Sequence, residues 1–269
     1  MNKKELVIIT GITGAIGNAL LAKYAPNAVV YGISRKGLHN SNFINPETSK
    51  LYPKTFICSI GELNAKNIHT FIESIDINQF SSITYFHLIG LYPFEINNKG
   101  EHWVENDKNG DGINDITHNL TYEIFKIFSL KIKSLAKISG ISGRSLIFGG
   151  IADKHEPIVH YSWWQTMKKT RNYMKKNASE NFGFHIINIS SVSCSHEIIT
   201  RPFIFIHTDA QIKYWLDPSE LINKIIQKNK SKKSFSGFHE YEIFNKVPRF
   251  NGSYYNDNLF TPRKVAELY

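Results

Sequence analysis

A glycine-rich turn near the start of the chain constrains the fold more than any other feature of the sequence. An apolar run at residues 6–9 leads into the sequence TGITGAIG at residues 10–17, and an amphipathic segment follows at residues 18–23. This order predicts a buried strand that turns through glycines into a helix, where main-chain N–H groups can contact the pyrophosphate of a dinucleotide. A glycine triplet alone is weak evidence, but a strand before it and a helix after it favour a dinucleotide site. The alternative is a tightly packed turn that binds nothing.

Strand-like and helix-like segments alternate along the rest of the chain. Apolar β-like runs lie at residues 28–34, 54–58, 83–89, 145–148, 184–189 and 241–244, and helical patterns lie at residues 62–75, 116–138, 159–181 and 218–228. Strands that alternate with helices imply right-handed crossovers and a parallel sheet covered on both faces. The sequence therefore predicts a single-domain α/β protein, with a doubly wound Rossmann fold and a mainly parallel sheet, over residues 1–269.

The basic composition raises the question of a nucleic-acid partner. The 269 residues carry a formal net charge of +9 at pH 7, with local basic groups at residues 168–176 and 228–233. Neither group has the interleaved aromatic residues of a surface that binds single strands, so we expect no nucleic-acid partner. A phosphorylated cofactor, or an acidic partner such as a carrier protein, explains a basic surface equally well.

The apolar segments and the cysteines bear on the cellular compartment. No apolar stretch approaches the roughly 20 residues that span a bilayer, and the first strand is not preceded by a signal-peptide core. Cys58 and Cys194 lack the spacing of a metal site, and we expect both to be buried thiols. These features favour a cytoplasmic protein without a membrane partner.

Several motifs occur in an order that resembles the short-chain dehydrogenase/reductase superfamily. They are the glycine turn, the pair Asn119-Leu120 on a central helix, and a helix led by Tyr161 that is followed by Gly183 and a strand. The resemblance covers residues 5–228 and implies a nicotinamide cofactor. Family members commonly pair through helices like those that begin near residues 116 and 159, so the resemblance also implies a homodimer or homotetramer.

The resemblance assigns catalytic positions, and two of them are changed in this chain. In the classical family a tyrosine transfers the substrate proton, a lysine lowers the pKa of that tyrosine, a serine orients the carbonyl, and an asparagine supports a proton relay. Tyr161 takes the tyrosine position and Asn119 the asparagine position. The lysine position holds Gln165, and the serine position falls in Phe-Gly-Gly at residues 148–150, without a hydroxyl. The segment that often reads Asn-Asn-Ala-Gly in the family is His-Leu-Ile-Gly at residues 87–90.

The missing lysine matters because a free phenol has a pKa near 10 and needs a nearby cation to act at neutral pH. Lys168 lies about two helical turns beyond Tyr161 and is one candidate for that cation. Divergent enoyl reductases of the superfamily use a tyrosine and a lysine at that wider spacing. When this sequence is aligned with theirs on Gly183, however, their lysine aligns with Gln165. Lys168 is otherwise a solvated helix residue. A histidine could also replace the lost acid, although structural roles are commoner; the nearby candidates are His155, His160 and His196.

The residues after the second predicted strand favour NADP(H) over NAD(H). Enzymes selective for NAD place a carboxylate there for the ribose 2′-hydroxyl, whereas an arginine accommodates a 2′-phosphate. Here the strand ends in Ser34-Arg35-Lys36, although these cations could also simply solvate a loop. Ser59 stands where the family has an adenine-contacting aspartate. The predicted cofactor-binding residues are Gly11, Thr13, Gly14, Ile16, Gly17, Ser34, Arg35, Lys36, Ser59, Ile60, Leu88 and Gly90.

Three segments are expected to be loops or tails with functions of their own. An inserted loop at residues 93–114 and a loop at residues 191–216 are expected to set substrate specificity, and the tail at residues 248–269 is expected to dock on the body or on a second subunit. Residues 107–115 resemble the first part of a calcium loop, but position twelve is His118 rather than a bidentate glutamate, so a hydrophilic turn is the favoured interpretation. No histidines have metal-site spacing, and we predict no metal site.

Together these features lead to one function and two alternatives. The leading expectation is an atypical NADP-dependent oxidoreductase that acts on a carbonyl or enoyl group of a small or carrier-bound substrate, with Tyr161 as proton donor and Asn119 in support. The first alternative is a catalytically inactive NADP-binding protein that serves as a sensor or as a subunit of a complex. The second is a lyase or isomerase without redox chemistry, because a fold alone does not fix a reaction.

Overall fold

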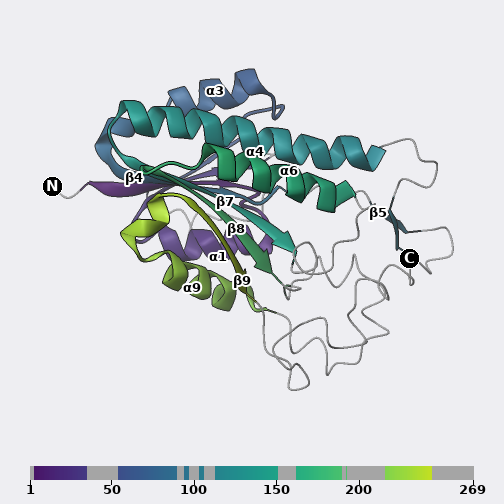
Figure 1. Ribbon diagram of the computed structural model, residues 1–269. Coiled ribbons are helices and arrows are strands. Elements are labelled where there is room, and N and C mark those ends of the chain that lie inside the picture. Colours follow the sequence, from purple (N-terminus) through teal and green to yellow (C-terminus); the bar gives the residue numbers. More distant parts are fainter. Residues whose placement is uncertain are drawn as a thin grey trace.

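A seven-stranded parallel sheet forms the centre of the molecule (Figure 1). The computed structural model describes residues 3–34, 54–89, 94–96, 103–105, 113–150, 162–189, 192 and 216–243. In sheet order the strands are β3 (Thr55–Cys58), β2 (Val29–Ile33), β1 (Lys4–Thr10), β4 (Phe80–His87), β7 (Ser142–Gly150), β8 (Phe182–Ile189) and β9 (Phe238–Ile243). The chain builds the sheet outward from β1 to β3 and then crosses to β4 on the other side of β1, so a topological switch point lies between β1 and β4.

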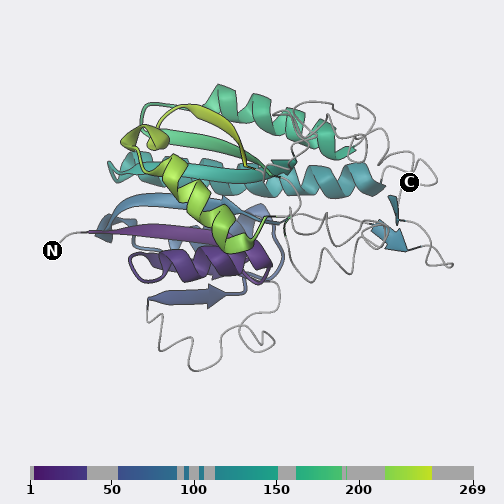
Figure 2. The same cartoon turned by 90° about the horizontal axis from the view of Figure 1, so that it is seen from below.

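Helices cover both faces of the sheet. One face carries α3 (Ala65–Glu73), α4 (Ile113–Ile138) and α6 (Ser162–Asn177), and the other carries α1 (Ala15–Tyr24) and α9 (Pro218–Asn229). Figure 2 shows α1 and α9 in front of the sheet. Two short 3-10 helices, η2 (Ile77–Gln79) and η4 (Lys232–Phe235), precede β4 and β9. This arrangement confirms the predicted doubly wound Rossmann fold.

Strand β4 shows why the central strands are apolar on both sides. Successive side chains of a strand point to opposite faces. Accordingly Ile83 and Tyr85 pack into the core under α3, α4 and α6, whereas Phe86 packs into the core under α1 and α9. All three side chains are fully buried. The continuous apolar runs in the sequence are therefore the signature of central parallel strands.

Most predicted elements are present, with shifted ends. Strand β7 is longer than the predicted 145–148, and β9 begins three residues before the predicted 241. Helix α3 starts later than the predicted residue 62 because the Asn64 side chain caps it, accepting a 3.0 Å hydrogen bond from the Asn67 N–H group. Because a capping side chain competes with the backbone for hydrogen bonds, it fixes the helix start more sharply than apolar periodicity does.

Two expectations need correction. The segment at residues 93–114 was expected to be a loop, but it contains an antiparallel pair of strands, β5 (Phe94–Ile96) and β6 (Trp103–Glu105), and the first residues of α4. Aromatic and β-branched residues in both short runs favour this pairing. Cys58 was expected to be buried and is only half-buried, because it lies at the end of β3 on the edge of the sheet. Within the described part of the chain, no helix combines the length and the apolar character needed to cross a membrane.

Candidate functional site

The glycine turn lies at the carboxyl end of β1, between the ends of β2 and β4. Gly11 has a φ angle of +72°, and its N–H group donates a 3.2 Å hydrogen bond to the Ile33 carbonyl. A Cβ atom on Gly11 would lie 2.9 Å from the Leu88 carbonyl oxygen, and one on Gly17 would lie 2.6 Å from the Gly11 carbonyl oxygen. Backbone closes the turn on both sides, so only glycine fits at these two positions.

The outer side of the turn is open. Gly14 is the N-cap of α1, and its N–H group donates a 3.1 Å hydrogen bond to the Gly11 carbonyl. Thr13 and Gly14 are exposed, and Gly14 has no side chain with which to cap the helix. The first backbone N–H groups of an α-helix have no partner within the helix and carry a partial positive charge. The turn therefore has the shape and the polarity to hold a phosphate group.

The other predicted cofactor residues within the described part of the chain gather along the same edge. The Ser34 N–H group donates a 3.1 Å hydrogen bond to the Cys58 carbonyl, which joins the ends of β2 and β3. The Leu88 N–H group donates a 3.2 Å bond to the Thr10 carbonyl, which joins the ends of β4 and β1. Ser59 and Ile60 directly follow β3, and Ser59 is exposed. Arg35, Lys36 and Gly90 lie outside the described residues.

A buried polar cluster that the sequence did not predict lies at the ends of β1 and β4. The Tyr85 hydroxyl is 2.7 Å from His87 Nδ1, and Thr10 Oγ1 is 3.4 Å from each of these atoms. Burial lowers the pKa of His87 to about 3 and raises the pKa of Tyr85 above its ordinary value. Both groups are thus uncharged at neutral pH and position one another rather than exchange protons with solvent. The histidine in the His-Leu-Ile-Gly motif at residues 87–90 was the sequence feature that could have pointed to this cluster.

The proposed catalytic residues are placed only in part. Asn119 lies on α4, and its Oδ1 accepts a 2.8 Å hydrogen bond from Lys169 Nζ on α6. Gln165 and Lys168 are exposed on the same helix, whereas Tyr161 lies just before it and outside the described residues. The sequence proposed Lys168 as the partner of Tyr161, and that pairing stays a prediction because Tyr161 lies outside the described residues.

The segment at the position of the family's serine has no side-chain hydroxyl. Phe148, Gly149 and Gly150 form the end of β7 at the carboxyl edge of the sheet, paired with the end of β8. Gly149 is buried. The side chains of this segment bring no hydroxyl that could orient a carbonyl.

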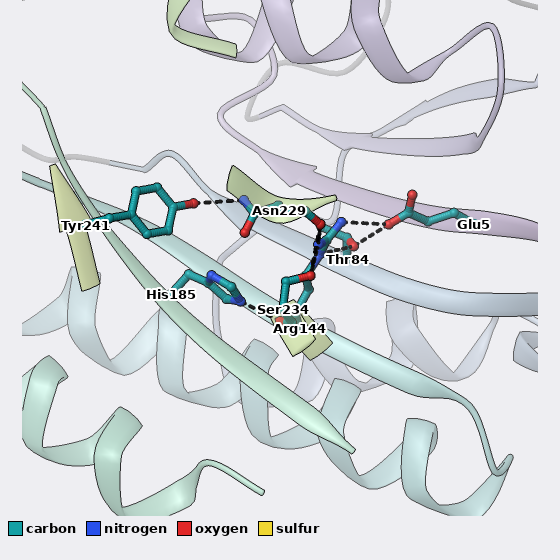
Figure 3. Close-up of polar contacts among 7 residues, drawn as sticks. All are labelled: Glu5, Thr84, Arg144, His185, Asn229, Ser234 and Tyr241. Atoms are coloured by element: carbon teal, nitrogen blue, oxygen red, sulfur yellow. Dashed lines mark hydrogen bonds and ion pairs between the residues drawn. The ribbon is translucent and has the colours of Figure 1, made fainter. Parts of the chain in front are cut away.

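A second polar cluster lies at the opposite, amino-terminal edge of the sheet and is closed to ligands (Figure 3). Arg144 is only 5% exposed and donates hydrogen bonds to Thr84 Oγ1 at 2.9 Å, the Asn229 carbonyl at 3.0 Å and Ser234 Oγ at 2.7 Å. Its guanidinium group also pairs with Glu5 at 3.4 Å. Each of the three nitrogens of this side chain contacts a protein group, so the cluster joins α9 and η4 to the sheet.

The described residues contain no group of three His, Cys, Asp or Glu side chains that could hold a metal ion. Residues 107–112 of the calcium-like segment lie outside the described part, and residues 113–115 are the start of α4. The loop at residues 191–216, of which only residues 192 and 216 are described, contributes an isolated parallel bridge between Val192 and Leu216. His155, His160, His196 and the tail at residues 248–269 also lie outside the described part.

Comparison with known proteins identifies the fold. No protein-family model and no curated protein sequence matches the chain, but solved structures match it closely in backbone arrangement. YwfH, an NADPH-dependent reductase involved in bacilysin biosynthesis, superposes with a TM-score of 0.68 at 12% identity, over 92% of this chain and 100% of the other.

Two further structures agree. A short-chain dehydrogenase from Salmonella enterica serovar Typhi has a TM-score of 0.66 at 11% identity, over 89% of this chain and 96% of its own. An alcohol dehydrogenase from the archaeon Thermococcus sibiricus, solved with 5-hydroxy-NADP, has a TM-score of 0.63 at 14% identity, over 91% and 99% of the two chains. The strand order, the glycine turn and these structures together show that the chain has the fold of the short-chain dehydrogenases and reductases.

Proposed function

We propose that this protein is an NADP-dependent oxidoreductase of the short-chain type that acts on a carbonyl or enoyl group of a small or carrier-bound substrate. The observation that carries the proposal is the glycine turn at the topological switch point of the sheet, where open α/β sheets bind their ligands. A Cβ atom on Gly17 would lie 2.6 Å from both the Gly11 oxygen and Ile12 Cα, so this close backbone cradle depends on glycine. Cofactor-binding proteins of similar structure include YwfH, which is described as NADPH-dependent.

The proposed cofactor fits the residues along the carboxyl edge. The cradle of Gly11, Gly14 and the first turn of α1 would hold the pyrophosphate, and no acidic residue occurs in that first turn. Ser34 is held at the end of β2 by its bond to the Cys58 carbonyl, and Arg35 is the next residue in the sequence. A guanidinium there would pair with a 2′-phosphate. When bound, NADPH supplies the hydride for a reduction.

The chain itself would supply the proton and the positioning groups. Tyr161, the residue before α6 in the sequence, is the proposed proton donor. Its phenol needs a nearby cation to act at neutral pH, and Gln165 cannot provide one. The proposed cations are Lys168 and Lys169, of which Lys169 holds the Asn119 side chain at 2.8 Å. Asn119, fixed in this way, would support the relay of the proton.

Calorimetric titration with NADPH, and with NADH as the comparison, tests the cofactor assignment. We expect NADPH to bind more tightly than NADH, and the Arg35→Ala variant to lose most of that difference because the 2′-phosphate loses its charge-assisted hydrogen bonds, worth about 1.5–3 kcal/mol each. Lys23→Ala removes an exposed cation at the far end of α1 and is the matched control. Absence of binding for both nucleotides would contradict the proposal.

Two variants test the proton donor. Tyr161→Phe should abolish reduction of carbonyl and enoyl substrates while NADPH still binds, because only the phenolic hydroxyl is removed. Gln165→Lys restores the family's lysine and should raise a weak reductase rate, since a cation one turn from Tyr161 lowers the phenol pKa. A Tyr161→Phe protein with unchanged activity would refute the assignment of Tyr161.

A second function is favoured by the residues that the site lacks. Gln165 replaces the lysine, and Gly149 and Gly150 stand at the serine position without a hydroxyl. These features support a catalytically inactive NADP-binding protein that acts as a sensor or as a subunit of a complex. Tight NADPH binding, together with no turnover of a carbonyl and enoyl panel by either the parent or the Gln165→Lys protein, would favour this second function.

A further inference from the structure

His87 is the last residue of β4 and lies beside the glycine turn, yet no step of the proposed function uses it. The parallel register of β4 and β1 sets His87 opposite Thr10, the residue before Gly11. Its imidazole meets the ring of Phe125 on α4 at a centroid distance of 5.6 Å, so the side chain lies on the face of the sheet that α4 covers. This buried polar ring therefore lies at the switch point, where open α/β sheets bind their ligands.

The hydrogen bonds of this ring indicate which of its nitrogens carries the hydrogen. The Thr10 hydroxyl donates to the Phe86 carbonyl at 3.3 Å, and the Tyr85 hydroxyl lies 2.7 Å from His87 Nδ1. If Nδ1 were the donor, the Tyr85 hydrogen would have only Thr10 Oγ1 at 3.4 Å among these groups, beyond the range of about 2.5–3.0 Å for a good O–H···O bond. Tyr85 therefore donates to Nδ1, and the neutral imidazole carries its hydrogen on Nε2.

The Nε2–H group of His87 is a buried donor without an acceptor. Nε2 makes no hydrogen bond within the described part of the chain. The backbone of Ile89 raises the pKa of His87, against the larger effect of burial, but it does not reach the geometry of a hydrogen bond to Nε2. The neighbouring backbone donor is occupied, because the Leu88 N–H group bonds to the Thr10 carbonyl. Unpaired buried donors are rare and costly, so this site favours a ligand that brings an acceptor.

The order of the strands assigns this donor to one half of the proposed cofactor. The cradle at the end of β1 would hold the pyrophosphate, and the end of β2, which leads to Arg35, lies on the side of the adenosine phosphate. Strand β4 lies on the other side of β1, one strand spacing of about 4.8 Å away, so its end is assigned to the nicotinamide half. We infer that the His87 Nε2–H group donates a hydrogen bond to an oxygen of the nicotinamide half, an inference that rests on the proposed function.

Packing fixes the imidazole before a ligand binds. Tyr85 is fully buried, and its ring stacks on Phe128 at a centroid distance of 5.0 Å and on Phe125 at 6.3 Å. The Tyr85 hydroxyl in turn holds His87 Nδ1. Because both rings are already ordered, His87 loses little conformational freedom when Nε2 gains an acceptor, and more of the hydrogen-bond energy contributes to affinity.

Calorimetric titration with two ligands tests the inference. NADPH contains both halves of the dinucleotide, whereas adenosine 2′,5′-bisphosphate contains only the adenosine half. In His87→Leu, which removes both ring nitrogens, we expect the Kd of NADPH to rise about tenfold, as the loss of one hydrogen bond predicts, and the Kd of the bisphosphate to change less than about twofold. The control His69→Leu, at an exposed position of α3, should leave both dissociation constants unchanged.

Two amide variants separate the two ring nitrogens. His87→Gln places an amide N–H group near the position of Nε2, whereas His87→Asn reaches only the position of Nδ1. We expect His87→Gln to bind NADPH within about threefold of the parent, and His87→Asn to stay about tenfold weaker. A side chain that only supports the fold would not distinguish the two amides in this way.

Several results would overturn the inference: an unchanged Kd of NADPH in His87→Leu, equal losses for NADPH and the bisphosphate, or equal affinities of the two amide variants. If these variants do not fold, NMR of the parent protein with isotope-labelled histidine replaces them. NADPH should then shift the Nε2 resonance of His87 and the bisphosphate should not, and any other pattern contradicts the inference. A parent that does not bind NADPH would contradict the proposed function itself, whereas binding that His87→Leu leaves unchanged contradicts only the role of His87.

Discussion

Because two histidines are buried, we expect the protein to lose stability as the pH falls below about 6.5. His87 and His185 are 2% and 1% exposed, and burial lowers the pKa of each to about 3 from an ordinary value of 6.5. Hydrogen bonds hold both rings in place, since His87 Nδ1 contacts the Tyr85 hydroxyl at 2.7 Å and His185 Nε2 contacts the Ser234 carbonyl at 2.6 Å. Between pH 6.5 and 3 the unfolded chain binds protons at these imidazoles and the folded chain does not.

The size of the effect follows from the pKa difference. At pH 5 the solution is about 1.5 units below the ordinary imidazole pKa, and each unit is worth about 1.4 kcal/mol, so each histidine lowers the free energy of unfolding by about 2 kcal/mol relative to neutral pH. The two together remove about 4 kcal/mol, a large part of the stability of an ordinary domain, which is about 5–15 kcal/mol. Well above pH 6.5 both imidazoles are neutral in the folded and in the unfolded chain, so this loss of stability is absent there.

Urea denaturation at pH 7, 6 and 5 and constant ionic strength measures this dependence. His185→Gln keeps a donor near Ser234, and His87→Asn keeps a polar atom near Tyr85, and each should remove about half of the loss between pH 7 and pH 5. His69→Gln replaces an exposed histidine of α3 and should leave the dependence unchanged. A free energy of unfolding that does not fall between pH 7 and pH 5, or that falls equally in all four proteins, would refute the reasoning.

Two further predictions concern the two edges of the sheet. Gly17→Ala places a methyl group 2.6 Å from the Gly11 oxygen, so it should lower the free energy of unfolding by about 1–3 kcal/mol and abolish NADPH binding. In the control, Gly14→Ala, the methyl group lies 3.4 Å from that oxygen, and the protein should fold normally. Equal stabilities of the two variants in urea would contradict this prediction. Arg144→Met should lower the free energy of unfolding by about 3 kcal/mol, because it removes the buried donor to Thr84 Oγ1, Ser234 Oγ and the Asn229 carbonyl and leaves the Glu5 carboxylate without its cation. Lys126→Met, at a half-exposed ion pair, should cost less than about 1 kcal/mol. Similar thermal shifts for the two variants would show that the buried network contributes little.

The sequence was most informative where local chemistry and overall fold coincide. The glycine turn predicted the βα junction, because the steric requirement that excludes a Cβ atom at Gly11 and Gly17 is a property of adjacent backbone. The apolar runs predicted the central strands for a similar reason, since burial on both faces leaves no polar alternation. The alternation of strands and helices then limited the topology to a doubly wound sheet, which the order of the seven strands confirms.

The sequence did not predict side-chain contacts between segments that are far apart along the chain. The pair of Asn119 and Lys169 depends on the rotation of α6 against α4, and the network of Arg144 joins residues from four segments of the chain. The spacing of apolar residues carries no information about such contacts. A single arginine in a predicted strand is interpreted as a solvated residue until its neighbours in the structure are known. The cluster of Thr10, Tyr85 and His87 similarly depends on the register of β1 against β4. The assignments of Tyr161, Arg35 and Lys36 stay predictions.

The Arg144 network also bears on how a protein of this fold can change its chemistry. The anchor that ties α9 and η4 to the sheet lies at the amino-terminal edge (Figure 3). The glycine cradle, the first turns of α4 with Asn119, and the glycines that end β7 lie at the other edge. Substitutions among the loops at the carboxyl edge therefore leave the main polar anchor untouched. Such a scaffold can lose or exchange residues around its ligand without a matching loss of folding stability. This separation provides a physical route by which a chain so distant in sequence from known dehydrogenases can keep their architecture while its site diverges.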